Sequence, residues 1–294
     1  MCDDHTEEDN AMFRTSGAEM SRRGFAAAAT VALAACAAGQ TADGQTTLAV
    51  TESDVTVTTP DGACDSYFVH PARGKHAAVL VWPDIMGLRP AFRQMGKRLA
   101  ESGYAVLVIN PFYRTAKAPV LQPGENFSQP DIRARLMPMA QALSATTATT
   151  DATAFLKFLD AQPAVDTSKK IGATGYCMGG PLVMRTAATA PGRIGAAATF
   201  HGGGLATQAP TSPHLLIPQM KASFLIAVAQ NDDERDPAAK DTLRTAFVAN
   251  HLAAEIEVYP AQHGWCPPDS QVYDAAQAEK AWGRMLALFQ TSLA

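Results

Sequence analysis

Short apolar runs alternate with amphipathic segments along most of the chain, starting near residue 50. The runs are short enough to be strands buried in a sheet, and they lie at 77–82, 104–109, 170–174, 195–200, 223–229 and 254–259. The segments between them carry apolar residues at helical spacing, and they lie at 92–102, 151–159, 237–251 and 273–293, with one more helix opened by Pro181. This alternation predicts a mostly parallel, doubly wound α/β sheet with helices on both faces.

Two segments do not follow the alternation. The runs 55–59 and 66–69 flank the turn residues Pro60-Asp61-Gly62, and this arrangement predicts a β-hairpin at the start of the domain. The stretch 113–130 is rich in proline and polar residues, which is typical of an irregular surface loop. No internal repeat follows, so residues 46–294 are expected to form one domain.

The first part of the chain has a different character. The pair Arg22-Arg23 precedes an uncharged, alanine-rich run at 26–38. This run is too short to span a membrane, which takes about 20 residues, and a charged segment before a short apolar run is typical of an export signal. We interpret residues 1–45 as a leader of the twin-arginine type and expect export to the periplasm. A frayed alanine-rich helix is the alternative interpretation.

The five cysteines divide between this leader and the domain. The leader holds Cys2 and Cys36, and residues 33–36 resemble a lipobox, which would make Cys36 a lipid anchor. The domain holds Cys64, Cys177 and Cys266. An odd number argues against a disulfide framework and leaves at least one free thiol.

Charge narrows the class of partner. The chain of 294 residues has a net charge of -4 and a pI near 6.0, and no run of lysine or arginine interrupts this balance. A basic surface for nucleic acid is therefore not expected. Neither a zinc spacing nor a nucleotide-binding glycine pattern is present, so we expect a small-molecule partner and no metal or cofactor.

The sequence Gly-Tyr-Cys-Met-Gly at 175–179 lies between a predicted strand and a predicted helix. This is the position of a nucleophile elbow, in which flanking glycines permit a tight turn that exposes the central residue above the sheet. Cys177 is therefore the candidate nucleophile, and the start of the following helix favours its thiolate. A buried core cysteine and a redox thiol are the alternatives.

A thiol nucleophile needs a base and an acid that orients the base. The strand at 223–229 runs into an acidic stretch, in which Asp232 is the candidate acid and Asp233 the alternative. The strand at 254–259 runs into a glycine-bearing loop with His263, the candidate base. In α/β-hydrolases the chain order is nucleophile, acid and histidine, each after a later strand. The competing histidines do not follow a late strand in such a loop; they are His201, His214 and His251.

Taken together, the cysteine-centred elbow, the Asn-Asp-Asp at 231–233 and the Gln-His-Gly-Trp at 262–265 resemble the dienelactone hydrolase family. The resemblance covers the domain from about residue 50 to the C-terminus. It implies an α/β-hydrolase fold and a triad of Cys177, Asp232 and His263 that acts on small esters or lactones. A broad carboxylesterase on the same fold and a non-hydrolytic thiol protein remain alternatives.

The resemblance also extends to the loop at 82–87. Family members often place a glutamate after this strand, where it holds the resting cysteine, whereas this chain has the shorter Asp84. This difference puts the reach of the carboxylate to the thiol in doubt. The same loop is expected to supply one oxyanion donor, the N–H of Ile85, beside the N–H of Met178.

Dienelactones carry a carboxylate, so a pocket for them needs a cation. Arg114 and the pair Arg133 and Arg135 are the candidates for it, and Tyr113 and Trp265 are further candidate substrate contacts. Surface arginines that keep a long loop soluble are the alternative interpretation. The sequence His-Gly-Gly-Gly at 201–204 spells an oxyanion motif of some lipases, but it follows the elbow instead of preceding it, so His201 is expected to be a wall residue.

Overall fold

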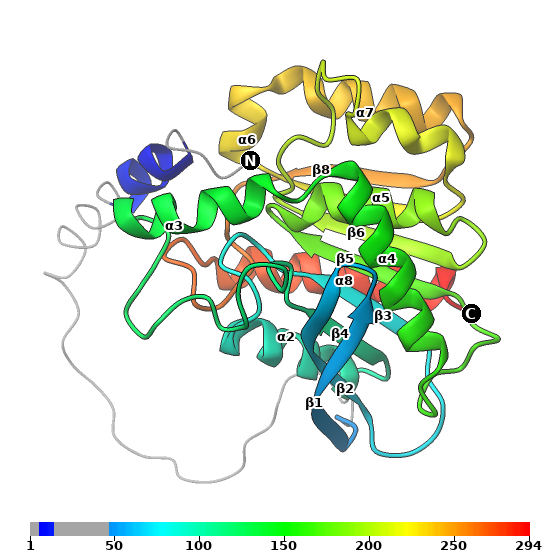
Figure 1. Ribbon diagram of the computed structural model, residues 1–294. Helices are drawn as coiled ribbons and strands as arrows, with labels where there is room; N and C mark the ends of the chain where they lie inside the picture. Colours follow the sequence, from blue (N-terminus) through cyan, green and yellow to red (C-terminus); the bar gives the residue numbers. More distant parts are fainter. Residues whose placement is uncertain (1–5, 15–46) are drawn as a thin grey trace, which may run out of the picture.

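The computed structural model describes residues 6–14 and 47–294. Within these residues, eight strands form one sheet with the order β1-β2-β4-β3-β5-β6-β7-β8 (Figure 1). The strands are β1 (Val50–Thr59), β2 (Gly62–Pro71), β3 (Ala78–Trp82), β4 (Ala105–Ile109), β5 (Ile171–Tyr176), β6 (Ile194–Phe200), β7 (Ser223–Ala229) and β8 (Ala254–Tyr259). The predicted α/β class and the positions of the strands are confirmed.

The sheet is antiparallel at one edge and parallel elsewhere. Strands β1 and β2 form the predicted hairpin, and β2 pairs antiparallel with β4. From β4 through β8 all neighbours are parallel. The chain order reverses at β3, which has β4 on one side and β5 on the other. Ligands bind at such a switch point, beyond the carboxyl ends of the strands.

Helices cover both faces of the sheet (Figure 1). One core contains Phe155, Val183 and Phe247, and the opposite core contains Phe92 and Phe289. Side chains of β3 alternate between these two cores, as expected for a strand buried on both faces. The helices of the first face are α4 (Ala145–Asp160), α5 (Gly179–Thr189) and α7 (Pro237–Ala249), and those of the second are α2 (Pro90–Glu101) and α8 (Ala275–Ser292).

Several helical segments differ from the prediction. The elbow helix α5 begins at Gly179, so Pro181 is its third residue and not its first. The acidic stretch after β7 forms the short helix α6 (Gln230–Arg235), and α3 (Pro130–Gln141) and a 3-10 helix (Pro213–Gln219) were not expected. These segments have few buried side chains. Apolar periodicity therefore has little to detect in them.

The predicted leader lies only partly within the described residues. Residues 6–14, which the sequence analysis assigns to the leader and not to the fold, form a helix beside α6 and the loop that follows β8. The arginine pair at 22–23, the alanine-rich run at 26–38 and Cys36 lie outside the described residues. In the ranges that the structure describes, no helix has both the length and the apolarity needed to cross a membrane.

Candidate active site

Cys177 lies at the turn between β5 and α5. Its backbone has a φ of 52°, which is unusual for a residue with a side chain. The Cys177 N–H donates to the Phe200 carbonyl oxygen of the neighbouring strand at 3.0 Å, which fixes this conformation. The side chain is 2% exposed and lies in a cavity wall. A strained residue that the surrounding structure holds in place is a feature of functional sites.

The flanking glycines are required by close backbone approach. A Cβ atom on Gly175 would lie 2.4 Å from the Gly179 carbonyl oxygen, and one on Gly179 would lie 2.3 Å from the Trp82 carbonyl oxygen. Neither neighbour is a flexible side chain that could move aside. The glycines at both sides of Cys177 therefore permit the tight packing of β3, β5 and α5 that an elbow needs.

Asp232 and His263 meet beside this turn. His263 Nδ1 lies 2.7 Å from Asp232 Oδ2, and the His263 N–H donates to Asn231 Oδ1 at 2.8 Å. Asp233 instead pairs with Lys240 at 2.6 Å. Of the two aspartates that the sequence left open, the structure places only Asp232 against the histidine. The competing His214 bonds to Ser212 and lines no part of the cavity.

The charges of these groups are coupled. Burial lowers the pKa of His263, but the Asp232 carboxylate and the Cys177 thiolate outweigh it and raise this pKa to about 10. Burial raises the pKa of Asp232, but the charge and hydrogen bond of His263 bring it below its ordinary value. The site therefore favours a protonated imidazole beside the Asp232 carboxylate at neutral pH.

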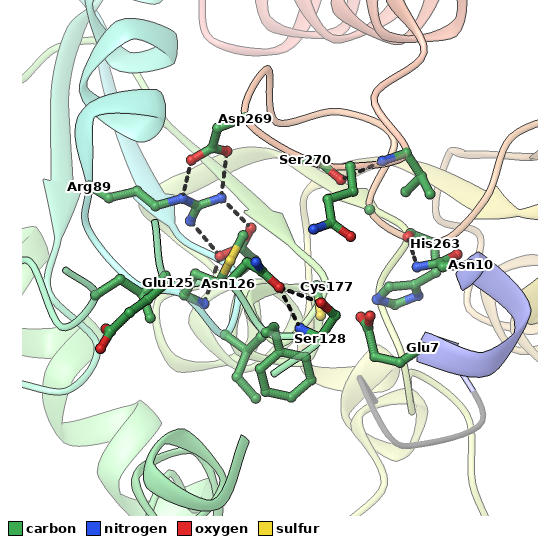
Figure 2. Close-up of a pocket in the computed structure, with 18 of the residues that line it drawn as sticks. Glu7, Asn10, Arg89, Glu125, Asn126, Ser128, Cys177, His263, Asp269 and Ser270 are labelled. Carbon is green, nitrogen blue, oxygen red and sulfur yellow. Dashed lines mark hydrogen bonds and ion pairs between the residues drawn. The ribbon is translucent and has the colours of Figure 1, made fainter. Parts of the chain in front are cut away.

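A cavity of about 460 Å³ opens beside Cys177 and His263 (Figure 2). The loop at 119–128 and the loop at 269–272 form much of its wall. His201 also lies in the wall, with its ring centroid 5.1 Å from that of His263. Burial lowers the pKa of His201, so this ring is neutral and cannot compete for the proton. Among the described residues, no group of three or more histidine, cysteine, aspartate or glutamate side chains could hold a metal ion.

Asp84 lies in the cavity wall but pairs with an arginine. Arg89 donates to both Asp84 carboxylate oxygens, at 2.7 and 3.0 Å, and also to Asp269 at 2.6 and 2.9 Å (Figure 2). Burial raises the pKa of Asp84, and Arg89 offsets part of this effect. The carboxylate expected to hold the resting cysteine is thus held by Arg89, a residue that the sequence analysis missed.

The loop that contains Asp84 also presents Ile85 to the cavity. Asp84 accepts hydrogen bonds from the N–H of Met86 and the N–H of Gly87, both at 2.9 Å, which closes a turn around Ile85. Met178 directly precedes the first residue of α5. Because β3 and β5 are parallel neighbours, both backbone segments lie at the same end of the sheet as Cys177. Their action as oxyanion donors stays a prediction.

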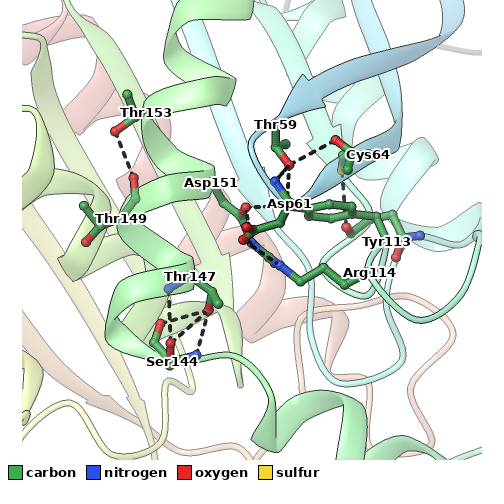
Figure 3. Close-up of polar contacts among 12 residues, drawn as sticks. Thr59, Asp61, Cys64, Tyr113, Arg114, Ser144, Thr147, Thr149, Asp151 and Thr153 are labelled. Carbon is green, nitrogen blue, oxygen red and sulfur yellow. Dashed lines mark hydrogen bonds and ion pairs between the residues drawn. The ribbon is translucent and has the colours of Figure 1, made fainter.

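Tyr113 and Arg114 lie outside the cavity. Both donate to the buried carboxylate of Asp151, Tyr113 at 2.7 Å and Arg114 at 2.8 and 2.6 Å (Figure 3). Arg114 also pairs with Asp61 of the hairpin turn. These contacts attach the hairpin to α4, and they do not agree with the predicted substrate contact. Neither residue is among those that line the cavity.

Trp265 and Arg133 also lie behind the cavity lining. Trp265 is fully buried, stacked on Tyr259 and edge-on to His201, so it supports the wall without reaching substrate. Arg133 donates to the carbonyl oxygen of Ser128, a lining residue, at 3.3 Å. Arg133 therefore lies next to the cavity, as does Arg135 through its ion pair with the lining residue Glu125.

Comparison with known proteins agrees with this architecture. The model of the dienelactone hydrolase family matches residues 64–293. Carboxymethylenebutenolidase from Pseudomonas putida is 24% identical over 216 residues, covering 74% of this chain and 86% of the relative. A crystal structure of a Klebsiella pneumoniae protein assigned to the dienelactone hydrolases aligns with a TM-score of 0.71 at 22% identity, covering 82% of this chain and 99% of that one. The chain belongs to the dienelactone hydrolase family and is an ester hydrolase.

Proposed function

We propose that the protein hydrolyses small esters or lactones through a thioester on Cys177, with His263 as proton carrier and Asp232 as its orienting partner. The observation that carries the proposal is the 2.7 Å contact between His263 and Asp232 beside the strained turn of Cys177, with Cys177 and His263 in the wall of one cavity. A core cysteine would need neither the left-handed turn nor a histidine of raised pKa.

The first half of the reaction forms the thioester. The Cys177 thiol gives its proton to His263, whose pKa of about 10 keeps it protonated at neutral pH. The thiolate adds to the ester carbonyl carbon, and the N–H groups of Ile85 and Met178 donate to the developing oxyanion. As the carbonyl re-forms, the bond to the ester oxygen breaks, and His263 donates its proton to the departing alkoxide.

The second half consumes water. Neutral His263 takes a proton from a water molecule, and the water oxygen adds to the thioester carbonyl. Collapse of this intermediate releases the carboxylic acid product and returns the Cys177 thiolate beside protonated His263. Asp232 accepts the hydrogen bond from His263 Nδ1, which leaves Nε2 to exchange the proton.

The Cys177→Ala and His263→Ala variants test the proposal with p-nitrophenyl acetate as probe. We expect both to lose hydrolysis while they keep the folded structure by circular dichroism. A redox thiol protein would keep its thiol chemistry in His263→Ala, because that role needs only Cys177. Hydrolysis at the wild-type rate by Cys177→Ala would contradict the proposal.

We further propose that the natural substrate is a small anionic lactone of the dienelactone type, with a general carboxylesterase as the second candidate. The position of Arg133 behind Ser128 supports an anionic substrate, because its charge lies near the cavity. Arg133→Ala should weaken binding of a carboxylated lactone by about 1 kcal/mol, which would raise its KM roughly fivefold. The KM for a neutral ester should stay unchanged.

Arg135→Ala is the matched control for this measurement. Arg135 lies on the same helix, but it is exposed and pairs with Glu125. Its removal should leave KM for both substrates unchanged. If Arg133→Ala changes KM for the carboxylated lactone and for the neutral ester by the same factor, the protein is better described as a general carboxylesterase.

We also propose export by the twin-arginine route, supported by Arg22-Arg23 before the uncharged run at 26–38. Replacing both arginines by lysine should leave the protein in the cytoplasm in a fractionation experiment. Unchanged fractionation would contradict this route. If Cys36 carries a lipid, Cys36→Ala should move the exported protein from the membrane to the soluble fraction.

A further inference from the structure

The helix of residues 6–14 lies at the mouth of the cavity and is bound to the two segments that carry His263 and Asp232. Asn10 is buried, and its Nδ2 donates to the carbonyl oxygen of His263 at 3.0 Å. Arg235, in the short helix that contains Asp232, donates to Thr6 at 2.9 Å and pairs with Asp9 at 2.8 Å. This helix thus contacts the loop of the base and the helix of the acid at once.

Glu7 extends from this helix into the cavity. Figure 2 shows its carboxylate directed toward Cys177 and His263. Together with Asn10 and Arg14, Glu7 forms part of the cavity lining. Burial raises its pKa, while the positive charges of Arg14, Arg133 and His263 act in the opposite direction. A carboxylate among these cations occupies the space that an anionic substrate would need.

The helix adds little to the core of the domain. None of the apolar clusters formed by the described residues contains a residue from 6–14. Thr6, Asp9 and Asn10 make polar contacts with the domain, and each such contact contributes about 1 kcal/mol. An element held in this way can separate from the domain without unfolding it. Attachment through the chain keeps its local concentration high, so it rebinds readily.

We propose that the helix of residues 6–14 is an intramolecular inhibitor that covers the cavity and keeps substrates from Cys177. This inference rests on the proposed function, because the helix would cover the same cysteine and histidine. The inhibitor is an acidic helix that binds at the cavity mouth, with Glu7 in the place of substrate. Because these residues belong to the predicted leader, removal of the leader would also remove the inhibitor.

The test measures access to Cys177 in the full chain. The probe is iodoacetamide, and mass spectrometry of the digested protein gives the alkylation rate of the peptide that contains Cys177. The double variant Asp9→Lys with Asn10→Ala removes two docking contacts, so we expect alkylation of Cys177 to become roughly thirtyfold faster. Glu7→Ala, which clears the cavity without altering those contacts, should also increase the rate.

Glu8→Gln is the control, because Glu8 is exposed on the same helix and its change removes the same charge as a change at Glu7. It should alkylate at the wild-type rate. All of these changes lie outside the domain, so a loss of folding does not confuse the result. Equal alkylation rates in the wild type, the double variant and Glu7→Ala would contradict the proposal that this helix is an inhibitor.

Hydrolysis of p-nitrophenyl acetate by the same proteins separates this inference from the proposed function. Faster alkylation together with faster hydrolysis supports both. Faster alkylation with no hydrolysis by any variant supports the inhibitor and contradicts the proposed function. Unchanged alkylation with normal hydrolysis contradicts the inhibitor and leaves the proposed function in place.

Discussion

Two arginine clusters in this protein have nearly the same composition but different surroundings. Arg89 joins the buried Asp84 to Asp269, whose side chain is 43% exposed. Arg114 joins the buried Asp151 to Asp61, whose side chain is 42% exposed. The first cluster lines the active-site cavity, whereas the second attaches the β-hairpin to α4. Similar ion pairs thus shape the site in one place and only the fold in the other.

The difference lies in what each buried carboxylate holds besides its arginine. Asp84 accepts the N–H of Met86 and so fixes the loop that presents Ile85. Asp151 accepts the hydroxyl of Tyr113, far from the reacting atoms. Breaking the first cluster should therefore affect both stability and catalysis, and breaking the second should affect stability alone.

Arg89→Ala should have the largest effect. It leaves the Asp84 carboxylate buried without its cation, which costs about 3–5 kcal/mol of stability for a buried pair. It also loosens the loop around Ile85, so we expect kcat for ester hydrolysis to fall by roughly tenfold to a hundredfold. Urea unfolding and steady-state kinetics on the same preparation measure the two effects. A wild-type kcat in a destabilised protein would show that the Arg89 cluster, like the Arg114 cluster, contributes to stability alone.

Arg114→Ala should lower the free energy of unfolding by about 1.5–3 kcal/mol, because its two hydrogen bonds to the buried carboxylate of Asp151 are lost. Tyr113 still donates to Asp151, so the loss should be smaller than that of Arg89→Ala. We expect kcat and KM for both charged and neutral esters to stay at their wild-type values. If KM rises for the carboxylated lactone alone, Arg114 contacts the substrate and its assignment to the fold alone is wrong.

The stability that His263 contributes and the stability that the Arg114 cluster contributes should also respond differently to pH. The pKa of His263 rises from an ordinary 6.5 to about 10 in the folded protein. Between these values the folded protein holds a proton that the unfolded chain has released, so stability from this proton is fully present below pH 6.5 and is lost as pH rises through 10. The difference in Tm between wild type and His263→Gln should therefore shrink at high pH.

Arg114→Ala provides the contrast in the same experiment. Arginine keeps its charge throughout this range, so the Tm difference between wild type and Arg114→Ala should stay constant. A Tm difference for His263→Gln that is the same on both sides of pH 10 would contradict the raised pKa of His263.

The fold and the positions of Cys177 and His263, and of Asp232 with Asp233 as its alternative, could be predicted because they depend on local patterns. Apolar runs identified the strands, and polar residues directly after parallel strands meet at one edge of the sheet. The glycines around Cys177 identified the turn because a side chain at 175 or 179 would collide with backbone. These constraints act over a few residues and are visible in the sequence.

Arg89, Arg114 and the helix of residues 6–14 could not be placed in this way. Whether an arginine faces a cavity depends on which carboxylate it meets, and Asp269 lies 180 residues from Arg89. No local pattern reports such a contact. The contacts of Asn10 with His263 and of Thr6 with Arg235 join residues still farther apart in the chain, by 253 and 229 positions. The composition of residues 1–45 predicts a leader outside the fold, so the sequence does not indicate that this segment contacts the domain.

The central claim is that Cys177 carries the acyl group, and the most direct test is to trap it. The His263→Gln variant removes the base that hydrolyses the thioester, while p-nitrophenyl acetate has a leaving group that needs no acid. At about pH 8.5, where an ordinary thiol is half ionised, we predict one released p-nitrophenol per chain. The Cys177 peptide should gain the mass of one acetyl group. Hydrolysis by the wild type with no acetyl group on Cys177 in this variant would contradict the account.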